Sequence, residues 1–362
     1  MSRRVFHIID NLDAGGAQEI IYMLSKYMME YETTVVSLYR KPQHNYFKKI
    51  EPFAPIISLS RSKIYIPLIL FRLFKVILKN SDAVFNFHLE ASCIIGSIIR
   101  FFIPFNMIVT IHAHPSQLPK WKNWLYYTLT KRCNFYVAAD KDTEGFLNKF
   151  NVSPSKIRFI PLGTELFDQP ASTNVKNVLE ELHIEHGKII LLNIGRMVPP
   201  KGQRDLIHVM RILKDRHPSL HAHLIIVGDG PEFDDLKKLV QELDVAQDTS
   251  LTGKRLDLNN FYAIADWFLM PCLDESMGMV VYEALANYIP IIAYNSGSIG
   301  EVVNDTDLGF LTDKDPMKIA EIISSTPVEE MKSRLRTKDL TRFSAKHLTN
   351  AYCHLYNEAV KL

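Results

Sequence analysis

The stretch that decides the fold is WFLMPCLDESMGMVVYEALA, residues 267–286. Its first four residues are apolar or aromatic and predict a buried strand, which runs into a polar loop. An amphipathic helix is predicted from near Gly278 to near Asn287. A buried strand joined to a helix by a short loop is the repeating unit of parallel sheets covered by helices.

Two carboxylates flank the start of this helix. Glu275 lies in the loop and Glu283 about a turn and a half into the helix, so both can face the space before the helix N-terminus. The unpaired N–H groups and the macrodipole of that terminus suit a phosphate. A sugar nucleotide could bind there, with the acids taking its hydroxyls. Alternatively, the acids act only as partners of the helix dipole.

The same alternation of strand and helix continues outward in both directions. Strands are predicted at 5–10, 33–38, 83–86, 107–112, 135–138, 157–161, 189–194, 222–227, 249–251, 267–270 and 291–293. Helices are predicted at 16–31, 66–79, 89–102, 121–131, 141–150, 203–216, 231–243, 258–265, 279–287 and 345–361. The pattern predicts an α/β protein of two Rossmann-like doubly wound domains facing one another across a cleft.

A polar, turn-rich stretch separates the two series of strands. We therefore expect an N-terminal domain at 1–168, a linker at 169–187 and a C-terminal domain at 188–343. A final helix at 344–362 is expected to pack back on the N-terminal domain.

The charge is distributed unevenly over the chain. The net charge is only +2, but residues 1–170 carry 21 Lys and Arg against 13 Asp and Glu. The segments 61–79 and 121–132 interleave cations with apolar and aromatic residues, which is typical of helices at a membrane interface. We expect an anionic membrane surface as partner, although an ordinary amphipathic helix with a solvated basic face would look similar. No nucleic-acid-binding motif accompanies the charge, so a nucleic acid is not expected as a partner.

The N-terminus and the cysteines bear on location. Residues 5–10 read as a core strand rather than a signal peptide. The apolar stretch 91–111 is interrupted by Arg100, Pro104 and Asn106, so a helix and a strand fit it better than a membrane span. We expect a cytoplasmic protein, peripheral at the inner face of the cytoplasmic membrane. The four cysteines show no paired spacing and predict neither disulfides nor a zinc site: Cys93, Cys133, Cys272 and Cys353.

Several short motifs follow the predicted strands in order. They are Asn193-Ile194-Gly195-Arg196 with Lys201-Gly202, Ile226-Val227-Gly228-Asp229-Gly230-Pro231, Leu251-Thr252-Gly253-Lys254, and the Glu275/Glu283 block ending at Glu301-Val302-Val303. Gly15-Gly16-Ala17-Gln18 and Ile160-Pro161-Leu162-Gly163 add to the set. Together these motifs resemble the retaining glycosyltransferases of family 4, which have the GT-B fold, over almost the whole chain. The resemblance implies acceptor binding by the N-terminal domain and nucleotide-sugar binding by the C-terminal domain.

The resemblance assigns roles to the charged residues. Arg196 and Lys201 would stabilise the diphosphate that leaves, each charge-assisted contact being worth about 1.5–3 kcal/mol, so neither a metal nor another cofactor is required. Glu283 would accept hydrogen bonds from the ribose. Glu275 would lie against the donor sugar near the reacting carbon.

Backbone groups complete the implied donor site. The N–H groups of Met277, Gly278, Met279 and Val280 would meet the sugar or the distal phosphate. The family usually has Gly and Phe where Ser276 and Met277 stand, so the sugar is left open.

The remaining implied contacts come from loops after other strands. Gly228, Gly253 and Lys254 would lie at the nucleotide, and Gly15 with Gly16 would let the backbone approach the phosphates. Alternatively, Gly15 and Gly16 form only a helix-entry turn.

Three histidines and one acidic pair are left with open interpretations. His112, at the end of a predicted strand, would lie near the sugar and the acceptor. His114 is a second candidate for this contact, and His88 would form part of the wall of the site. Each of the three could instead be an ordinary buried or capping histidine. The Asp305-Thr306-Asp307 run reads as a surface turn rather than a metal site.

The resemblance thus implies a metal-independent, retaining, hexosyltransferase-type enzyme. It would use a UDP- or GDP-sugar donor and a saccharide acceptor, lipid-linked, in cell-surface polysaccharide or lipopolysaccharide biosynthesis. The alternatives are a nucleotide-sugar epimerase or a sugar phosphorylase on the same fold, or a non-catalytic nucleotide-sugar-binding scaffold.

Overall fold

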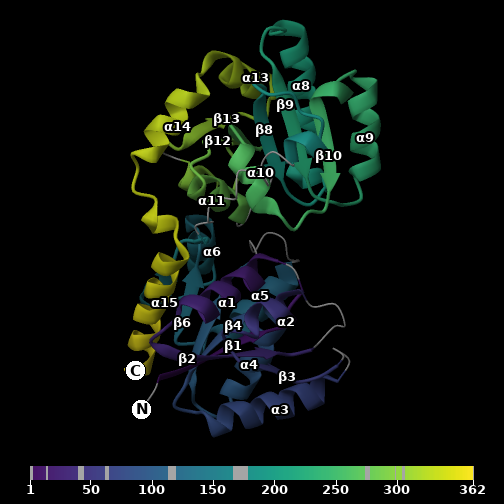
Figure 1. Ribbon diagram of the computed structural model, residues 1–362. Coiled ribbons are helices and arrows are strands. Elements are labelled where there is room, and N and C mark those ends of the chain that lie inside the picture. The colour runs from purple at the N-terminus through teal and green to yellow at the C-terminus, as the bar shows by residue number, and fades with distance from the viewer. Residues whose placement is uncertain are drawn as a thin grey trace. The chain divides into compact units, whose positions relative to one another are not determined.

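A computed structural model of the chain describes residues 3–13, 15–39, 45–61, 65–112, 120–165, 178–273, 278–297, 299–303 and 306–361. The chain divides into two compact units. Unit 1 comprises Met1–Gly163 with Arg342–Leu362, and unit 2 comprises Thr164–Thr341. Each unit is built on one sheet of parallel strands, as Figure 1 shows.

The sheet of unit 1 has seven strands in the order β3-β2-β1-β4-β5-β6-β7. Its strands are β1 Arg3–Ile9, β2 Tyr31–Ser37, β3 Ile56–Ser58, β4 Val84–His88, β5 Asn106–Thr110, β6 Phe135–Ala138 and β7 Ile157–Phe159. Its α-helices are α1 Gly16–Tyr27, α2 Asn45–Ile50, α3 Ile66–Lys79, α4 Glu90–Arg100, α5 Lys120–Thr130, α6 Lys141–Lys149 and α15 Ala345–Val360.

The two faces of this sheet differ in chemistry, because side chains alternate along each strand. On one face, Phe85 and Phe87 of β4 join Phe6 and Ile8 of β1 in an apolar core with α3, α4 and α5. On the other face β4 carries Asn86 and His88, both buried. This second face also carries the buried Val5, Ile9 and Val84, so it is mixed, and its buried polar side chains need hydrogen-bond partners.

The final helix, α15, supplies partners to this mixed face. Asn86 Nδ2 donates to the hydroxyl of Tyr356 at 2.8 Å, and Thr110 Oγ1 lies 3.4 Å from the hydroxyl of Tyr352. Ser344 caps the helix by accepting from the backbone N–H of His347. α15 also lies beside α1 (Figure 1), so the last segment of the chain is part of unit 1.

The sheet of unit 2 has six strands in the order β10-β9-β8-β11-β12-β13. Its strands are β8 Ile189–Ile194, β9 Ala222–Val227, β10 Thr249–Gly253, β11 Trp267–Met270, β12 Ile291–Tyr294 and β13 Gly309–Thr312. Its α-helices are α8 Gln203–Arg216, α9 Phe233–Glu242, α10 Leu258–Ile264, α11 Met279–Ala286, α12 Ile299–Val302, α13 Pro316–Ser325 and α14 Val328–Arg336.

The two strand orders follow one rule. In each unit the first strand lies in the middle, two strands extend to one side, and the rest extend to the other. This is the doubly wound Rossmann-like arrangement, so the predicted α/β fold class is confirmed.

Most predicted elements are present within a few residues, and the predicted helices at 66–79 and 203–216 have the observed bounds. The elements α2, β3, β13, α13 and α14 have no counterpart in the prediction. β3 has three residues and β13 four, too few to show a period. None of the helices in the described part of the chain is long and apolar enough to cross a membrane.

Candidate functional site

The carboxyl edge of the unit 2 sheet brings the sequence motifs together. Gly195 directly follows β8, Gly228 directly follows β9, and Gly253 ends β10. These three strands are neighbours, so motifs that lie far apart in the sequence meet at one edge. The strand order reverses between β8 and β11, and open parallel sheets bind ligands outside the carboxyl ends of their strands at such a point.

Glycine backbones hold the loops of this edge in contact. Gly228 has φ +147°, and a Cβ there would lie 1.9 Å from the carbonyl oxygen of Gly195. The N–H of Gly195 donates to Val227 at 2.9 Å, and that of Gly228 donates to Gly253 at 2.9 Å. A side chain at Gly228 would therefore force the β8 and β9 loops apart.

Both predicted phosphate-binding cations follow β8. Arg196 is exposed, and Lys201 is half-buried in the short 3-10 helix Pro199–Lys201. Gly202 has φ +69°, and a Cβ there would lie 2.1 Å from the carbonyl oxygen of Pro271. The loop that carries Lys201 is thus packed against the chain that leaves β11.

The segment after β11 is bonded to the same loop. The N–H of Leu273 donates to the carbonyl of Pro200 at 2.8 Å, and Cys272 Sγ lies 3.1 Å from the same oxygen. Glu275 and Met277 follow immediately and lie outside the described residues. The described residues on either side of this gap are Leu273, bonded to Pro200, and Gly278 at the start of α11.

α11 begins where the sequence predicts. Gly278 is its N-cap and is buried, while Met279 and Val280 are half-buried in its first turn. Glu283 is half-buried in the same helix, and its Oε2 accepts a hydrogen bond of 2.6 Å from the hydroxyl of Tyr262 on α10.

The phenol of Tyr262 was not anticipated, because nothing in the sequence links it to an acid 21 residues away. Burial, and then the adjacent Glu283 carboxylate, raise the pKa of Tyr262 well above its usual value. Tyr262 therefore remains a hydrogen-bond donor that orients Glu283.

Lys254 is exposed just after β10. Its neighbour Arg255 donates from Nε and from a terminal nitrogen to the two oxygens of Asp257, both at 2.8 Å, and also pairs with Glu181. The Arg255 hydrogen bonds lower the pKa of Asp257 to about 2. Arg255 therefore maintains the loop, which leaves Lys254 as the cation at the end of β10.

In unit 1 the strand order reverses between β1 and β4. Gly15, the exposed N-cap of α1, and Gly16, its first residue, follow β1. Asp10, also after β1, was not singled out from the sequence. Its carboxylate accepts from the N–H groups of Ser92 at 2.8 Å and Ala91 at 3.3 Å, so it occupies the N-terminus of α4. Burial raises the pKa of Asp10 to about 6.

His112 lies two residues beyond β5, half-buried, with its Nε2 2.7 Å from Nδ1 of the fully buried His88. His88 thus contacts the candidate residue directly. Burial lowers the pKa of His112 to about 3, so its imidazole is neutral. His114 lies outside the described residues, as does Asp305, whereas Asp307 forms an ion pair of 2.6 Å with Lys338.

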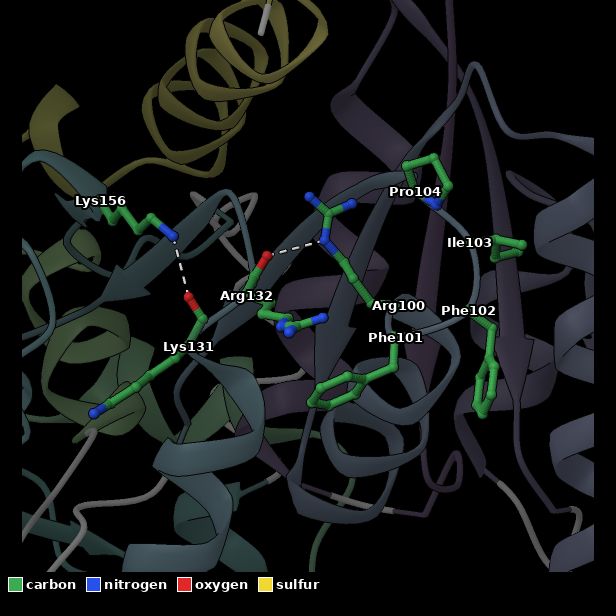
Figure 2. A pocket seen from close by; sticks show the side chains of 8 residues that line it. All are labelled: Arg100, Phe101, Phe102, Ile103, Pro104, Lys131, Arg132 and Lys156. Carbon is green, nitrogen blue, oxygen red and sulfur yellow. Dashed lines mark hydrogen bonds between the residues drawn. The ribbon is translucent and has the colours of Figure 1, made fainter.

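A second feature of unit 1 is a cationic hollow at the ends of α4 and α5, shown in Figure 2. It has a volume of about 440 Å³, and none of its eight lining residues is acidic: Arg100, Phe101, Phe102, Ile103, Pro104, Lys131, Arg132 and Lys156. The guanidinium of Arg132 lies 4.1 Å from the centroid of the Phe101 ring. Two aromatic side chains are largely exposed: Phe102 is 75% exposed, and Trp121 on α5 is 64% exposed.

Two family profiles match the chain. The profile described as "Glycosyltransferase Family 4" matches residues 14–166, and that of "Glycosyl transferases group 1" matches residues 175–339. Among solved structures, Anabaena Alr3699/HepE in complex with UDP is similar with a TM-score of 0.84 at 16% identity, over 98% of this chain and 100% of that one.

Curated relatives show the same likeness. The chain is 27% identical to alpha-monoglucosyldiacylglycerol synthase of Streptococcus pneumoniae over 59% of its own length and 49% of the relative. It is 26% identical to the UDP-Gal:alpha-D-GlcNAc-diphosphoundecaprenol alpha-1,3-galactosyltransferase of Escherichia coli over 72% of its own length and 70% of the relative. The chain therefore spans about half the length of the first of these two relatives and 70% of the length of the second.

Proposed function

The chain belongs to the group 1 glycosyltransferases of family 4, with the GT-B fold, and on that premise we propose that it transfers a sugar from a nucleotide-diphospho-sugar to a saccharide acceptor. The observation that carries the proposal is the carboxyl edge of unit 2. There Arg196 and Lys201 follow β8 at the reversal of strand order, and Glu283 is oriented by Tyr262. Cations suit the diphosphate and the carboxylate suits the ribose.

In the proposed reaction the bond between the anomeric carbon and the phosphate breaks, and the acceptor oxygen bonds to the same face of the sugar. The leaving phosphate takes the proton of the acceptor hydroxyl. Arg196 and Lys201 stabilise the charge that develops on the diphosphate, and no metal is required. Product anomers assigned by NMR test retention, and turnover in excess EDTA tests the absence of a metal.

The phosphate contacts can be separated from the rest of the nucleotide. We expect Arg196→Ala to weaken UDP binding by about tenfold or more, since a charge-assisted contact is worth about 1.5–3 kcal/mol. Uridine, which has no phosphate, should bind this variant as it binds the wild type. Arg216→Ala, which removes an exposed cation at the end of α8, is the control. Equal losses for UDP and uridine would remove Arg196 from the phosphate site.

The donor is proposed to be a UDP- or GDP-sugar. The similar HepE structure holds UDP, and the Escherichia coli relative is named for UDP-Gal. Scanning calorimetry with UDP, GDP and ADP identifies the base, because the nucleotide that binds most tightly stabilises the folded protein most.

The acceptor is proposed to be a lipid-linked saccharide of cell-surface polysaccharide or lipopolysaccharide biosynthesis. The names of the relatives include a diacylglycerol glycolipid and a diphosphoundecaprenol. The cationic hollow of unit 1, with Phe101 and Phe102 at its rim and Trp121 and Trp124 exposed on α5, fits the headgroup region of an anionic membrane. We propose that the protein works as a peripheral protein at the inner face of the cytoplasmic membrane.

One assay separates this function from its alternatives. The chain is incubated with the UDP- or GDP-sugar whose nucleotide it binds, with and without a lipid-linked saccharide. A product that carries one more sugar, formed only with acceptor, supports the transferase. A changed sugar nucleotide without acceptor indicates an epimerase, a sugar phosphate formed with inorganic phosphate indicates a phosphorylase, and nucleotide binding without products indicates a scaffold.

Glu275 can be tested in the same assay. We expect Glu275→Ala to lose turnover and to keep UDP binding, because its proposed contact is with the sugar. Unchanged turnover would exclude this role for Glu275.

A further inference from the structure

Three histidines of unit 1 form a continuous hydrogen-bonded chain. His7 lies in the middle of β1, His88 ends β4, and His112 follows β5. Nδ1 of His7 lies 3.0 Å from Nε2 of His88, and Nδ1 of His88 lies 2.7 Å from Nε2 of His112. His88 uses a different ring nitrogen for each neighbour. The rings therefore lie in series and do not converge on one point, as the ligands of a metal ion would.

All three imidazoles are neutral. His7 and His88 are fully buried, and burial lowers the pKa of His7 and of His112 to about 3 and that of His88 well below its usual value. A neutral imidazole has one N–H and one lone pair, so each hydrogen bond in the chain fixes the tautomer of both rings.

The chain therefore has only two proton arrangements. In the first, every Nδ1 carries the proton: His7 donates to His88, His88 donates to His112, and His112 keeps an N–H at Nδ1. In the second, every Nε2 carries the proton, the direction of donation is reversed, and the unused N–H is at Nε2 of His7.

The two ends of the chain decide between these arrangements. Nε2 of His7 and Nδ1 of His112 are buried and have no hydrogen-bond partner in the described part of the protein. His7 is fully buried within β1, whereas His112 lies beyond the carboxyl end of β5, where open parallel sheets bind their ligands, so a ligand oxygen is expected at His112 and not at His7. A buried N–H without a partner is rarer in proteins than an unpaired acceptor. This favours the lone pair at His7 and the N–H at His112.

We propose that His7 and His88 are positioning residues that hold His112 in its Nδ1–H form, ready to donate to an oxygen of a ligand bound at the carboxyl edge of the unit 1 sheet. Free imidazole rings prefer the Nε2–H form, so the chain imposes the less common tautomer. This inference rests on the proposed function for the identity of the ligand, and on the described contacts alone for the tautomer.

The tautomer can be measured without any ligand. In the ¹⁵N NMR spectrum of the full chain, a protonated ring nitrogen is separated from an unprotonated one. We expect protonated Nδ1 and unprotonated Nε2 at His112. His88→Leu should return His112 to the Nε2–H form. His88→Gln should keep the Nδ1–H form, because the Gln amide can accept from His7 and donate to His112.

A matched control lies on the same face of the sheet. Thr110 is buried and donates to Asn86 at 2.9 Å but contacts none of the three rings through a hydrogen bond given by the structure. Thr110→Val should leave the tautomer of His112 unchanged. If His88→Leu does not fold, His7→Phe is the second test variant. It removes the donor to His88 and should therefore also release the tautomer of His112.

Two results would overturn the inference: an Nε2–H tautomer at His112 in the wild type, or an unchanged tautomer in the folded variant that breaks the chain. If glycosyl transfer is observed, kcat/KM should fall about tenfold in His88→Leu and recover in His88→Gln. A wild type with the expected tautomer and without transfer would contradict the proposed function and leave the histidine chain intact.

Discussion

Glu283 of the candidate site is held by a buried phenol, which donates to it at 2.6 Å. Its distance from the start of α11 was evident in the sequence. Its partner Tyr262 comes from a different helix, and only folding brings the two together.

The proposed ribose contact predicts a difference between two ligands. Wild type should bind UDP about tenfold more tightly than 2′-deoxy-UDP, and Glu283→Ala should abolish that difference, since hydrogen bonds to a charged group contribute about 1.5–3 kcal/mol. Tyr262→Phe should weaken UDP binding by a smaller factor. Calorimetry measures all three, with Tyr288→Phe at an exposed tyrosine as control. A difference that persists in Glu283→Ala would exclude the ribose role.

Asp10 predicts a pH effect on stability. Its folded-state pKa of about 6 lies above the usual value of 3.8, so its contribution to folding is complete below about pH 4 and is lost as the pH rises through 6. Asp10→Asn does not ionise and can still accept from Ser92. Relative to wild type, its free energy of unfolding should increase by up to about 3 kcal/mol between pH 4 and pH 7. Urea denaturation at both pH values measures this. A constant difference would contradict the raised pKa.

At the scale of elements, the strand-to-helix loops carry the site, and glycine determines how closely they approach. Gly228 and Gly253 both have positive φ, +147° and +69°, but their surroundings differ. A Cβ at Gly228 would meet a backbone carbonyl, while nothing lies within 4 Å of one at Gly253.

This contrast predicts unequal costs for the same substitution. Gly253→Ala should cost about 1–2 kcal/mol of stability, from backbone conformation alone. Gly228→Ala should cost about 3 kcal/mol or more and should also weaken UDP binding, because the Gly195 loop must move. Chemical denaturation and calorimetry measure the two effects. Equal costs at both positions would show that the close approach is unimportant.

The elements themselves were predictable where the apolar period was long. The helix at 66–79 buries Ile69, Leu73 and Ile77 at the spacing its sequence shows. β3 and β13 are short and gain their stability from neighbouring strands. Local sequence contains no signal of such pairing, so they were missed.

At the scale of the whole molecule, the uneven charge has a structural counterpart in unit 1. The hollow of Figure 2 and the exposed aromatic residues of α5 place cations beside apolar rings on one unit. Cations near an anionic lipid surface contribute about 1 kcal/mol each, and buried rings add apolar transfer energy.

Vesicle binding should therefore depend on this hollow. The protein should bind vesicles that contain phosphatidylglycerol, and pure phosphatidylcholine vesicles far less. Arg132→Glu should weaken binding by about 30-fold, because it changes two unit charges. Phe102→Ser should weaken it by about tenfold. The same charge reversal at Lys237, exposed on α9 of unit 2, is the control for cosedimentation. Equal loss with Lys237→Glu would point to net charge instead of this surface.

The sequence by itself determined the fold class and the candidate residues, because apolar period and turn chemistry are local and the motifs stand in the order of their strands. Only the tertiary structure decided how these residues are supported. Tyr262 on Glu283, Asp10 at α4, and His7 with His88 behind His112 are contacts between segments distant in sequence. Hydrogen bonds and desolvation depend on which atoms meet in space, and parallel sheets bring together residues that no local pattern connects.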